Sequence, residues 1–242
     1  MRTPRTGGDP FQPQRREPPI NLPPVVLAAL AALFAVFLLQ EFVLGYATNM
    51  MVWQEFGFIP ARYVHALGSQ DLAWLWSPLT YSLLHGGWSH IIFNAIWLAI
   101  FGAPVAKRLG PVRFLLLWLT SAAASAFFFA LTDWGAATVL IGASGVVSAY
   151  MGAACRFVFA GGRFLPQAHL GPRLSIGAVF ADPTARAFVL VWLVGNLLVA
   201  VGVSFIGVSA ADIAWQAHVG GFLFGFLAFP LFDVKTPRTL IF

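Results

Sequence analysis

Six long apolar runs constrain the fold of this chain more than any other feature of its sequence. Each is close to the roughly 20 mostly apolar residues that a helix needs to cross the hydrocarbon core of a bilayer. The runs occupy residues 24–45, 81–103, 112–132, 142–160, 186–207 and 213–232. Only 10% of the residues are charged, against roughly 25% in an ordinary soluble domain. The sequence therefore predicts an all-α polytopic membrane protein with six transmembrane helices, and it argues strongly against a soluble fold.

The basic residues indicate how these helices are oriented. Lys and Arg accumulate in the short cytoplasmic loops of membrane proteins. When successive loops are assigned to alternate sides of the bilayer, all but one of the 14 basic residues fall on one side, and the exception is Arg62. The opposite side carries Glu55, Asp71, Asp133 and Asp212. We therefore expect both termini to be cytoplasmic. The basic residues form short clusters between apolar runs and not one basic face, so we expect no nucleic-acid partner.

The segments outside the spans indicate the domain organisation. Residues 1–23 are rich in arginine and proline, which is typical of a disordered cytoplasmic tail. Residues 24–233 are predicted to form one six-helix membrane domain, and residues 234–242 a short C-terminal tail. Within that domain, residues 46–80 form a long outer loop whose many aromatic side chains indicate a segment in the headgroup zone.

Several polar residues lie inside or at the ends of the apolar runs. Such groups are costly within a bilayer, and they usually mark a functional site or a hydrogen bond between helices. They are His85, His90, Asn94, Ser144, Ser148, Gln216 and His218. All of them lie toward the outer ends of the second, fourth and sixth predicted helices. Three separate segments are therefore expected to bring polar groups to one depth.

The first of these segments is HGGWSHIIFN, residues 85–94. His90 and Asn94 are four residues apart, so their side chains share one face of a helix. His85 is separated from them by two glycines and is expected to anchor a loop. The spacing does not match the HExxH zinc signature, and a single cysteine, Cys155, excludes a paired-cysteine site. We therefore expect no metal and no other cofactor.

The second segment, Gly142-Ala-Ser144-Gly145, opens the fourth predicted helix after an apolar loop at residues 134–143. Irregular backbone at membrane depth is tolerated where it is buried in protein or lines a wet cavity. We therefore expect this loop to dip inward and to carry Ser144 below the surface, beside the free N–H groups of a helix start. The motif alone is weak, because serines in membrane helices commonly bond to the backbone or to a neighbouring helix.

The third segment is AHVGGFLFG, residues 217–225. Gly221 and Gly225 form a pair of small residues that allows another helix to approach closely. The fourth helix is the expected partner, because it carries small residues at the same spacing. Such a contact would place His218 near Ser144. A lone histidine in such a helix would otherwise be interpreted as a packing or hydrogen-bonding residue.

These three segments, in this order within a six-helix frame, resemble the rhomboid family of intramembrane serine proteases over residues 24–233. The matching residues are His85, His90 and Asn94, then Gly142, Ser144 and Gly145, then Ala217, His218, Gly221 and Gly225. The resemblance implies a serine-type endopeptidase with Ser144 as nucleophile and His218 as general base and later acid. It also implies an oxyanion hole formed by His90, Asn94 and the backbone N–H of Ser144.

The chain departs from the family pattern at three places, one of which is Ala106, where the family usually has a glutamate before the lysine at 107. Ser148 stands where many members have a tyrosine on which the catalytic histidine ring stacks, and Tyr150 lies on a different side of the helix. The outer loop has Trp76-Ser77 in place of a Trp-Arg pair, so we expect tryptophans to hold this loop more than polar contacts do. The run at 186–207 and the loop at 208–213, with Phe205 and Ile206 nearby, resemble the family's lateral gate and cap.

The resemblance implies that the substrates are other membrane proteins, cleaved in or near a transmembrane segment within the lipid bilayer. Two other functions stay open. One is a catalytically silent rhomboid-like protein that binds or escorts membrane proteins; such proteins lose the serine or the histidine, and both are present here. The other is a small transporter, although residues 24–132 and 142–232 show no repeat of the kind found in transporters. We expect a bacterial plasma membrane with the active site open to the non-cytoplasmic side; an organellar membrane and the oligomeric state are left open.

Overall fold

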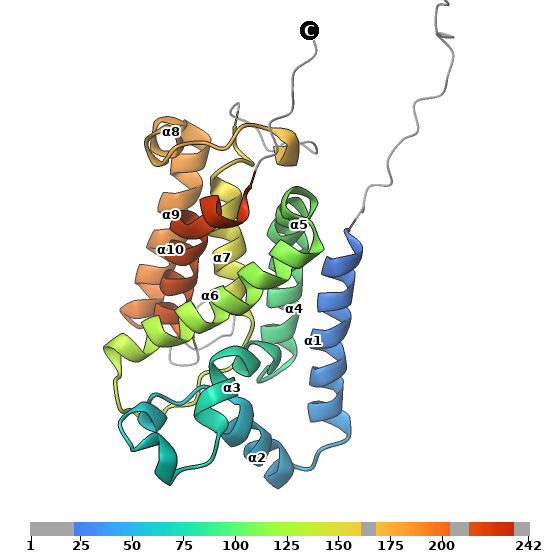
Figure 1. The fold of residues 1–242 in the computed structure, drawn as a ribbon, viewed down its shortest axis with the longest axis vertical. Coiled ribbons are helices and arrows are strands. Elements are labelled where there is room, and N and C mark those ends of the chain that lie inside the picture. Colours follow the sequence, from blue (N-terminus) through green and yellow to red (C-terminus); the bar gives the residue numbers. More distant parts are fainter. Residues whose placement is uncertain (1–21, 161–167, 204–212, 235–242) are drawn as a thin grey trace, which may run out of the picture.

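The computed structural model describes residues 22–160, 168–203 and 213–234, which form a bundle of helices (Figure 1). The α-helices are α1 (Pro24–Phe42), α2 (Tyr46–Phe56), α3 (Ala73–Thr80), α4 (Trp88–Trp97), α5 (Ala103–Leu109), α6 (Pro111–Thr132), α7 (Ser144–Cys155), α8 (Ile176–Ala181), α9 (Pro183–Ala200) and α10 (Trp215–Phe232). Short 3-10 turns are η1 (Pro60–Tyr63), η2 (Leu67–Ser69), η3 (Tyr81–Leu83) and η5 (Ala168–Leu170), and η4 (Leu98–Gly102) is a π-helical turn. Nearly all of the two expected tails, and the expected cap with Phe205 and Ile206, lie outside the described residues.

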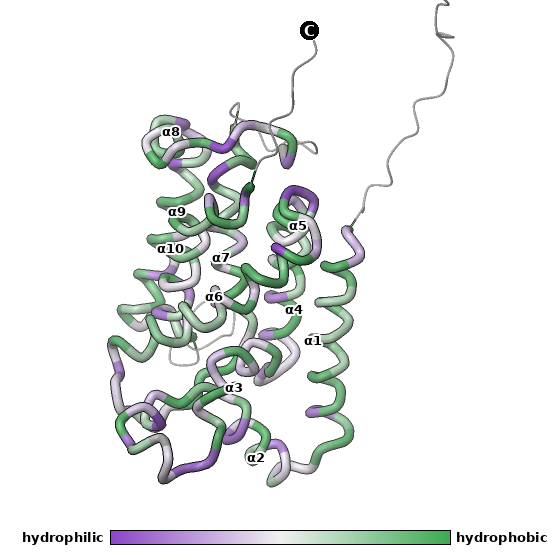
Figure 2. The backbone as a smooth tube through the Cα atoms, viewed as in Figure 1, coloured by the Kyte–Doolittle hydropathy of each residue, from purple (hydrophilic) through white to green (hydrophobic). Residues whose placement is uncertain are grey.

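Within the described residues, five helical segments are long and apolar enough to cross a membrane. They are Pro24–Phe42, Trp88–Leu109, Pro111–Thr132, Pro183–Ala200 and Trp215–Phe232. The remaining predicted run, the fourth in the chain, contains α7, an apolar helix of only 12 residues. Figure 2 shows hydrophobic residues along the length of these helices. The apolar runs thus located the long helices correctly, and the fourth run was predicted too long because its flanks are not helical.

The second predicted run, 81–103, differs most from the structure. Its helix begins later, at Trp88, because residues 81–87 form a 3-10 turn and a loop that contains two glycines. It also continues further, to Leu109, through the π-helical turn η4. Pro104 lies just after this turn and lacks the N–H that a regular helix would use. A π turn can absorb such an interruption without ending the helix.

Local sequence signals account for several helix boundaries. Pro24, Pro111 and Pro183 stand in the first turn of α1, α6 and α9, where the missing N–H of proline costs nothing. Asp182 caps α9 by accepting hydrogen bonds from the N–H groups of its first turn. Gly110 separates α5 from α6 with a φ of 76°, a conformation that glycine adopts readily.

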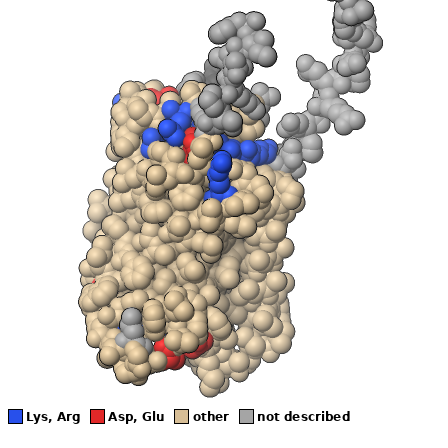
Figure 3. All heavy atoms as spheres, viewed as in Figure 1, with Lys and Arg blue, Asp and Glu red and all other residues tan. Residues whose placement is uncertain are grey.

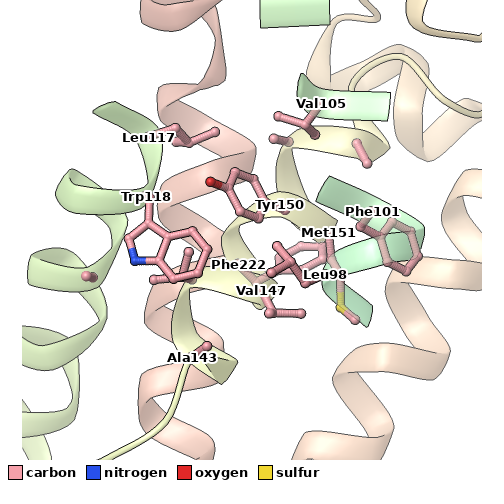
Figure 4. Packing of buried hydrophobic residues seen from close by; sticks show 14 of the residues in the cluster. Leu98, Phe101, Val105, Leu117, Trp118, Ala143, Val147, Tyr150, Met151 and Phe222 are labelled. Atoms are coloured by element: carbon pink, nitrogen blue, oxygen red, sulfur yellow. The ribbon is translucent and has the colours of Figure 1, made fainter. Parts of the chain in front are cut away.

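The centre of the bundle is the contact between α7 and α10. A Cβ added at Gly221 would overlap the carbonyl oxygen of Gly145, and one added at Gly225 would overlap that of Ala149. Glycine is therefore required at both positions for the backbones to approach this closely. Every residue of α7 after Ser144 is buried, and Figure 4 shows its side chains packed among those of the surrounding helices. This contact agrees with the predicted pairing of the fourth and sixth spans.

Charge is distributed unequally between the two ends of the bundle. Figure 3 shows Lys and Arg gathered at the end that carries α5 and α8, while acidic residues gather at the end formed by α2 and α3. At the basic end, Arg108 makes two bonds of 2.9 Å to the buried carboxylate of Asp233. Arg156 donates to the carbonyl oxygens of Phe226 and Leu174. These bonds tie the end of α10 to the neighbouring helices.

Candidate active site

Ser144 is the first residue of α7 and is half-buried. It follows Gly142, whose φ of 113° lies in the region that favours glycine and turns the chain sharply into the helix. The N–H of Gly142 donates to the carbonyl oxygen of Tyr81 over 2.9 Å, which fixes the turn to the segment before α4. The first N–H groups of a helix have no partner within the helix. Ser144 therefore lies beside unpaired backbone donors.

The loop that leads to Ser144 is held by the outer segment, residues 46–80. Phe58 and Leu140 form an antiparallel bridge with N···O distances of 3.1 and 2.8 Å, and the N–H of Ala61 donates to the carbonyl oxygen of Ala136 over 2.9 Å. Leu140 is buried. Figure 1 shows the loop rising from the α2–α3 end into the bundle before α7 begins. The backbone at the serine thus has a defined position although the loop is not helical.

His90 of α4 lies directly against the turn that precedes Ser144. A Cβ added at Gly142 would overlap the His90 ring at Nε2, so only glycine leaves room for this ring. The backbone N–H of Gly86 donates to Nδ1 of His90, with 3.5 Å between the two nitrogen atoms. A neutral imidazole that accepts at Nδ1 carries its proton on Nε2. The ring therefore presents an N–H donor to the Gly142 side.

Asn94 and His85 flank His90 on either side. Asn94 is buried one helical turn later, and its Nδ2 donates to the carbonyl oxygen of His90 over 3.1 Å, which leaves its second amide hydrogen for another acceptor. His85 lies in the loop before α4, buried, with its ring edge-on to that of His90 at a centroid distance of 5.0 Å. The structure thus places His90, Asn94 and His85 together.

His218 lies in the first turn of α10 and is half-buried. It is one turn before Gly221, whose backbone touches Gly145, the neighbour of Ser144. Its ring is close enough to that of His90 for the two to interact electrostatically. No hydrogen bond joins Ser144 and His218, both of which are described residues. The partner of the His218 ring is Asn196 of α9, with 3.0 Å between Nδ1 and Oδ1.

Asn196 did not appear among the residues singled out from the sequence. It is a polar residue within the apolar run at 186–207, and the argument applied to the other intramembrane polar groups would have found it. It belongs to no recognised motif, and a single asparagine in a span usually bonds to a neighbouring helix. Only the structure shows that its partner is His218.

Comparison with known proteins identifies the family of the chain. A family model described as the Rhomboid domain matches residues 73–233, which is more than half of the chain. The chain belongs to the rhomboid family. With five helices of spanning length among its described residues, it is an integral, multi-pass membrane protein.

Curated relatives support this assignment. The Rhomboid protease GlpG of Pectobacterium atrosepticum is 33% identical to the chain over 204 residues. The Rhomboid protease GlpG proteins of Serratia proteamaculans and Yersinia pestis are 29% and 28% identical to it. In each case the match covers 84% of this chain and 61% of the relative. The chain therefore spans somewhat less than two thirds of the length of these relatives.

The position at which many rhomboid proteins have a tyrosine is occupied here by the buried Ser148. Tyr150 does not take over that place. Its ring stacks on Phe114 of α6 at a centroid distance of 4.5 Å, and its hydroxyl donates to the carbonyl oxygen of Phe114 over 3.0 Å. Figure 4 shows Tyr150 directed toward Leu117 and Trp118 of α6. Among the described residues, no aromatic ring stacks on His218.

The outer segment differs from the rhomboid expectation in another way. The missing arginine after Trp76 was expected to leave this segment held mainly by tryptophans. The structure shows that Arg62 supplies polar anchoring from a different position, because its guanidinium donates to the carbonyl oxygens of Gly57 and Gln54. Further bonds join Tyr63 to Trp74, Gln70 to Arg62 and Thr80 to Phe56, each at 2.7 Å. Polar contacts therefore anchor this segment more extensively than the missing arginine led us to expect.

Proposed function

We propose that the chain is an intramembrane serine endopeptidase that cleaves peptide bonds in or near the transmembrane segments of other membrane proteins. One observation carries the proposal. The backbones of α7 and α10 touch at Gly145 and Gly221, which brings the start of both helices, with Ser144 and His218, to one place. The names of the curated relatives point to the same activity.

The proposed reaction uses Ser144 and His218 as a dyad. The Ser144 hydroxyl attacks the scissile carbonyl carbon while Nε2 of His218 accepts its proton. The C–N bond then breaks, and the imidazolium returns this proton to the leaving amine, which leaves an acyl-enzyme on Ser144. A water molecule, deprotonated by His218, attacks the ester carbonyl carbon; the C–O bond to Ser144 then breaks, His218 returns the proton to the serine oxygen, and the second product is released. Catalytic hydrogen bonds of substrate-free enzymes are often long and tighten when substrate binds.

The negative charge of the tetrahedral intermediate requires donors beside Ser144. We assign this role to the side chains of His90 and Asn94 and to the backbone N–H of Ser144. The His90 ring contacts the turn at Gly142, and Asn94 has one uncommitted amide hydrogen. Donors that are already in place when charge develops stabilise the transition state without the cost of reorganising solvent.

The topology proposed for this enzyme has six transmembrane helices within residues 24–233, with α7 as the short fourth one. The basic end of the bundle would then face the cytoplasm together with the tails at 1–23 and 234–242, as the positive-inside rule requires. The segment at 46–80 would lie in the opposite interface, and the site would open there to water. The relatives named above come from bacteria, so we place the protein in a bacterial plasma membrane.

A substrate helix has to unwind before it can be cut, because its peptide carbonyls are hydrogen-bonded and shielded by side chains. Helix-breaking residues in the substrate would lower the cost of unwinding. We propose that the substrate enters beside α9, which buries only Ala185 and Val189 near its beginning and exposes most of its remaining length. A helix with so few buried side chains can move at lower cost than α7.

The test is cleavage of a reporter with a single transmembrane helix by the full chain in liposomes. We expect Ser144→Ala and His218→Ala each to abolish cleavage, and Ser144→Ala to abolish labelling by a fluorophosphonate. Ser148→Ala, which changes a serine one turn further along α7, is the matched control and should retain labelling. Cleavage that persists in both variants would refute the dyad, and a wild-type protein that binds the reporter without cutting or labelling would instead be a silent binding factor.

A further inference from the structure

We propose that Asn196 is a positioning residue for His218, which it holds in the tautomer that leaves Nε2 free to act as the base. The inference rests on the proposed function, because it concerns the same histidine. Asn196 lies on α9 and His218 on α10, and the two side chains meet at 3.0 Å. The proposed site thus becomes a serine, a histidine and an asparagine contributed by three helices.

The tautomer follows from the donors and acceptors around the asparagine. One amide atom of Asn196 lies 2.9 Å from the carbonyl oxygen of Trp192, which can only accept, so that atom is the amide nitrogen. The atom facing His218 is therefore the amide oxygen, which can only accept. Nδ1 of His218 must then be the donor. A neutral imidazole with its proton on Nδ1 has its lone pair on Nε2, which is the atom that the proposed reaction requires.

Packing beside this bond keeps the two helices in register. Trp192 is one turn before Asn196, and Phe222 is one turn after His218, so both pairs lie on the facing sides of α9 and α10. The rings of Trp192 and Phe222 stack with a centroid distance of 4.2 Å and an interplanar angle of 21°. The residue whose carbonyl orients the Asn196 amide is thus itself held against α10.

This bond also replaces a contact that the chain lacks. Where many rhomboid proteins have a tyrosine for the catalytic ring to stack on, the chain has Ser148, whose hydroxyl offers no aromatic surface. A hydrogen bond to Nδ1 limits the rotation of the ring and selects one tautomer, whereas stacking only limits its rotation. The other titratable group that acts on His218 is His90 of α4, and it carries no charge in the neutral form that donates from Nε2.

The simplest alternative is that the bond only stabilises helix packing, as many polar contacts in membranes do. A direct measurement of the tautomer separates the two roles without any activity. We propose ¹⁵N NMR of histidine-labelled Ser144→Ala protein in nanodiscs, with the His218 resonance assigned by His218→Gln. We expect a protonated Nδ1 and an unprotonated Nε2. In the double variant Ser144→Ala/Asn196→Leu, the His218 ring should interconvert between its two neutral tautomers. An unchanged tautomer in the double variant would overturn the inference.

Kinetics of the otherwise wild-type enzyme give a second test. We expect Asn196→Leu to lower kcat by about ten-fold, with little change in KM, because one neutral hydrogen bond to the base is lost. Asn196→Asp keeps an acceptor and adds a negative charge that favours the imidazolium. It should retain most of kcat near neutral pH or above, and it should move the acid limb of the kcat profile to higher pH, since a higher pH is then needed to deprotonate His218.

The matched control is Val112→Ala, which truncates a side chain on α6 that is 68% exposed and lies outside the proposed entry path beside α9. It should change neither kcat nor the pH profile. If Asn196→Leu behaves like this control, the positioning role is refuted while the dyad stands. If instead cleavage survives Ser144→Ala and His218→Ala, the proposed function itself fails. The two failures are therefore distinguishable in the same assay.

Discussion

α10 makes two helix contacts of opposite character at the proposed site. Toward α7 it presents glycines, and the two backbones touch where any side chain at Gly221 or Gly225 would overlap a carbonyl oxygen. Toward α9 it presents side chains, namely the ring of Phe222 and the imidazole of His218, which meet Trp192 and Asn196. The first contact is rigid because backbone atoms cannot rearrange, whereas the second can loosen by rotation of side chains.

This difference divides the proposed catalytic tasks between two regions. The separation of the serine from the histidine is set by the backbone contact of α7 with α10. The orientation of the histidine ring is set by α9, which exposes most of its length. The proposed entry of a substrate helix beside α9 requires a helix that can move. If α9 moves to admit substrate, the same motion would release the bond that orients the base.

The largest effect is expected from a methyl group placed in the rigid contact. Gly225→Ala puts a Cβ onto the carbonyl oxygen of Ala149. We expect it to lower the free energy of unfolding by more than about 3 kcal/mol, at or beyond the upper range for overpacked cores. Activity should be lost together with the fold. Thermal unfolding in detergent, followed by intrinsic fluorescence, measures the change.

Gly195→Ala on α9 is the matched control for this prediction. Nothing lies within 4 Å of a Cβ at Gly195, so this substitution should be neutral or should stabilise the helix by up to about 1 kcal/mol through its propensity. Equal destabilisation by both substitutions would contradict the contrast between the two contacts. A stable, active Gly225→Ala protein would show that the α7–α10 contact is not rigid.

The next largest effect is expected on catalysis, with little change in helix packing. Asn94→Ala removes a proposed oxyanion donor on α4, and we expect kcat to fall by about 10²–10³ while KM changes little. The stability should fall only slightly, because the amide bonds to a carbonyl oxygen within its own helix. Steady-state kinetics with the reporter measure the change. Asn49→Ala on α2, far along the chain from the site, is the control for the loss of an asparagine. A kcat within about two-fold of wild type would remove Asn94 from the oxyanion hole.

The smallest effect is expected where α7 packs against α6. Tyr150→Phe removes the hydroxyl that donates to Phe114 and leaves a buried carbonyl oxygen without that bond. We expect a loss of about 1 kcal/mol in unfolding free energy and an unchanged kcat. Parallel unfolding and cleavage assays measure both quantities. A clear loss of activity at full stability would place Tyr150 in the site, contrary to its packing against α6.

Most residues of the candidate site could be named from the sequence because the signals that mark them are local. Ser144 follows a glycine turn, His90 and Asn94 are one helical turn apart, and His218 stands one turn before Gly221. Each of these relations depends on the geometry of a single helix or turn. Their spatial neighbours depend on how helices pack, and no local pattern indicated that His90 contacts Gly142.

The outer segment shows the same limit more clearly. Its aromatic residues and its length were evident from the sequence, but the anchoring by Arg62 was not. Arg62 donates to the backbone carbonyl oxygens of Gly57 and Gln54. Such bonds leave no pattern in the sequence, because every residue has a backbone carbonyl group. The bridge between Phe58 and Leu140 joins two segments far apart in the chain, and neither is long enough to be predicted as a strand.

The sequence by itself determined the long apolar helices, the asymmetry of charge between the two ends and the motif residues, because hydrophobic length, loop charge and helical periodicity are properties of neighbouring residues. Only the tertiary structure decided that α10 touches α7 backbone to backbone and that Asn196 meets His218. Both depend on the relative placement of separate helices. Two helices settle where the side chains on their facing surfaces fit together. This fit depends on both surfaces at once, so the sequence of one segment cannot reveal it.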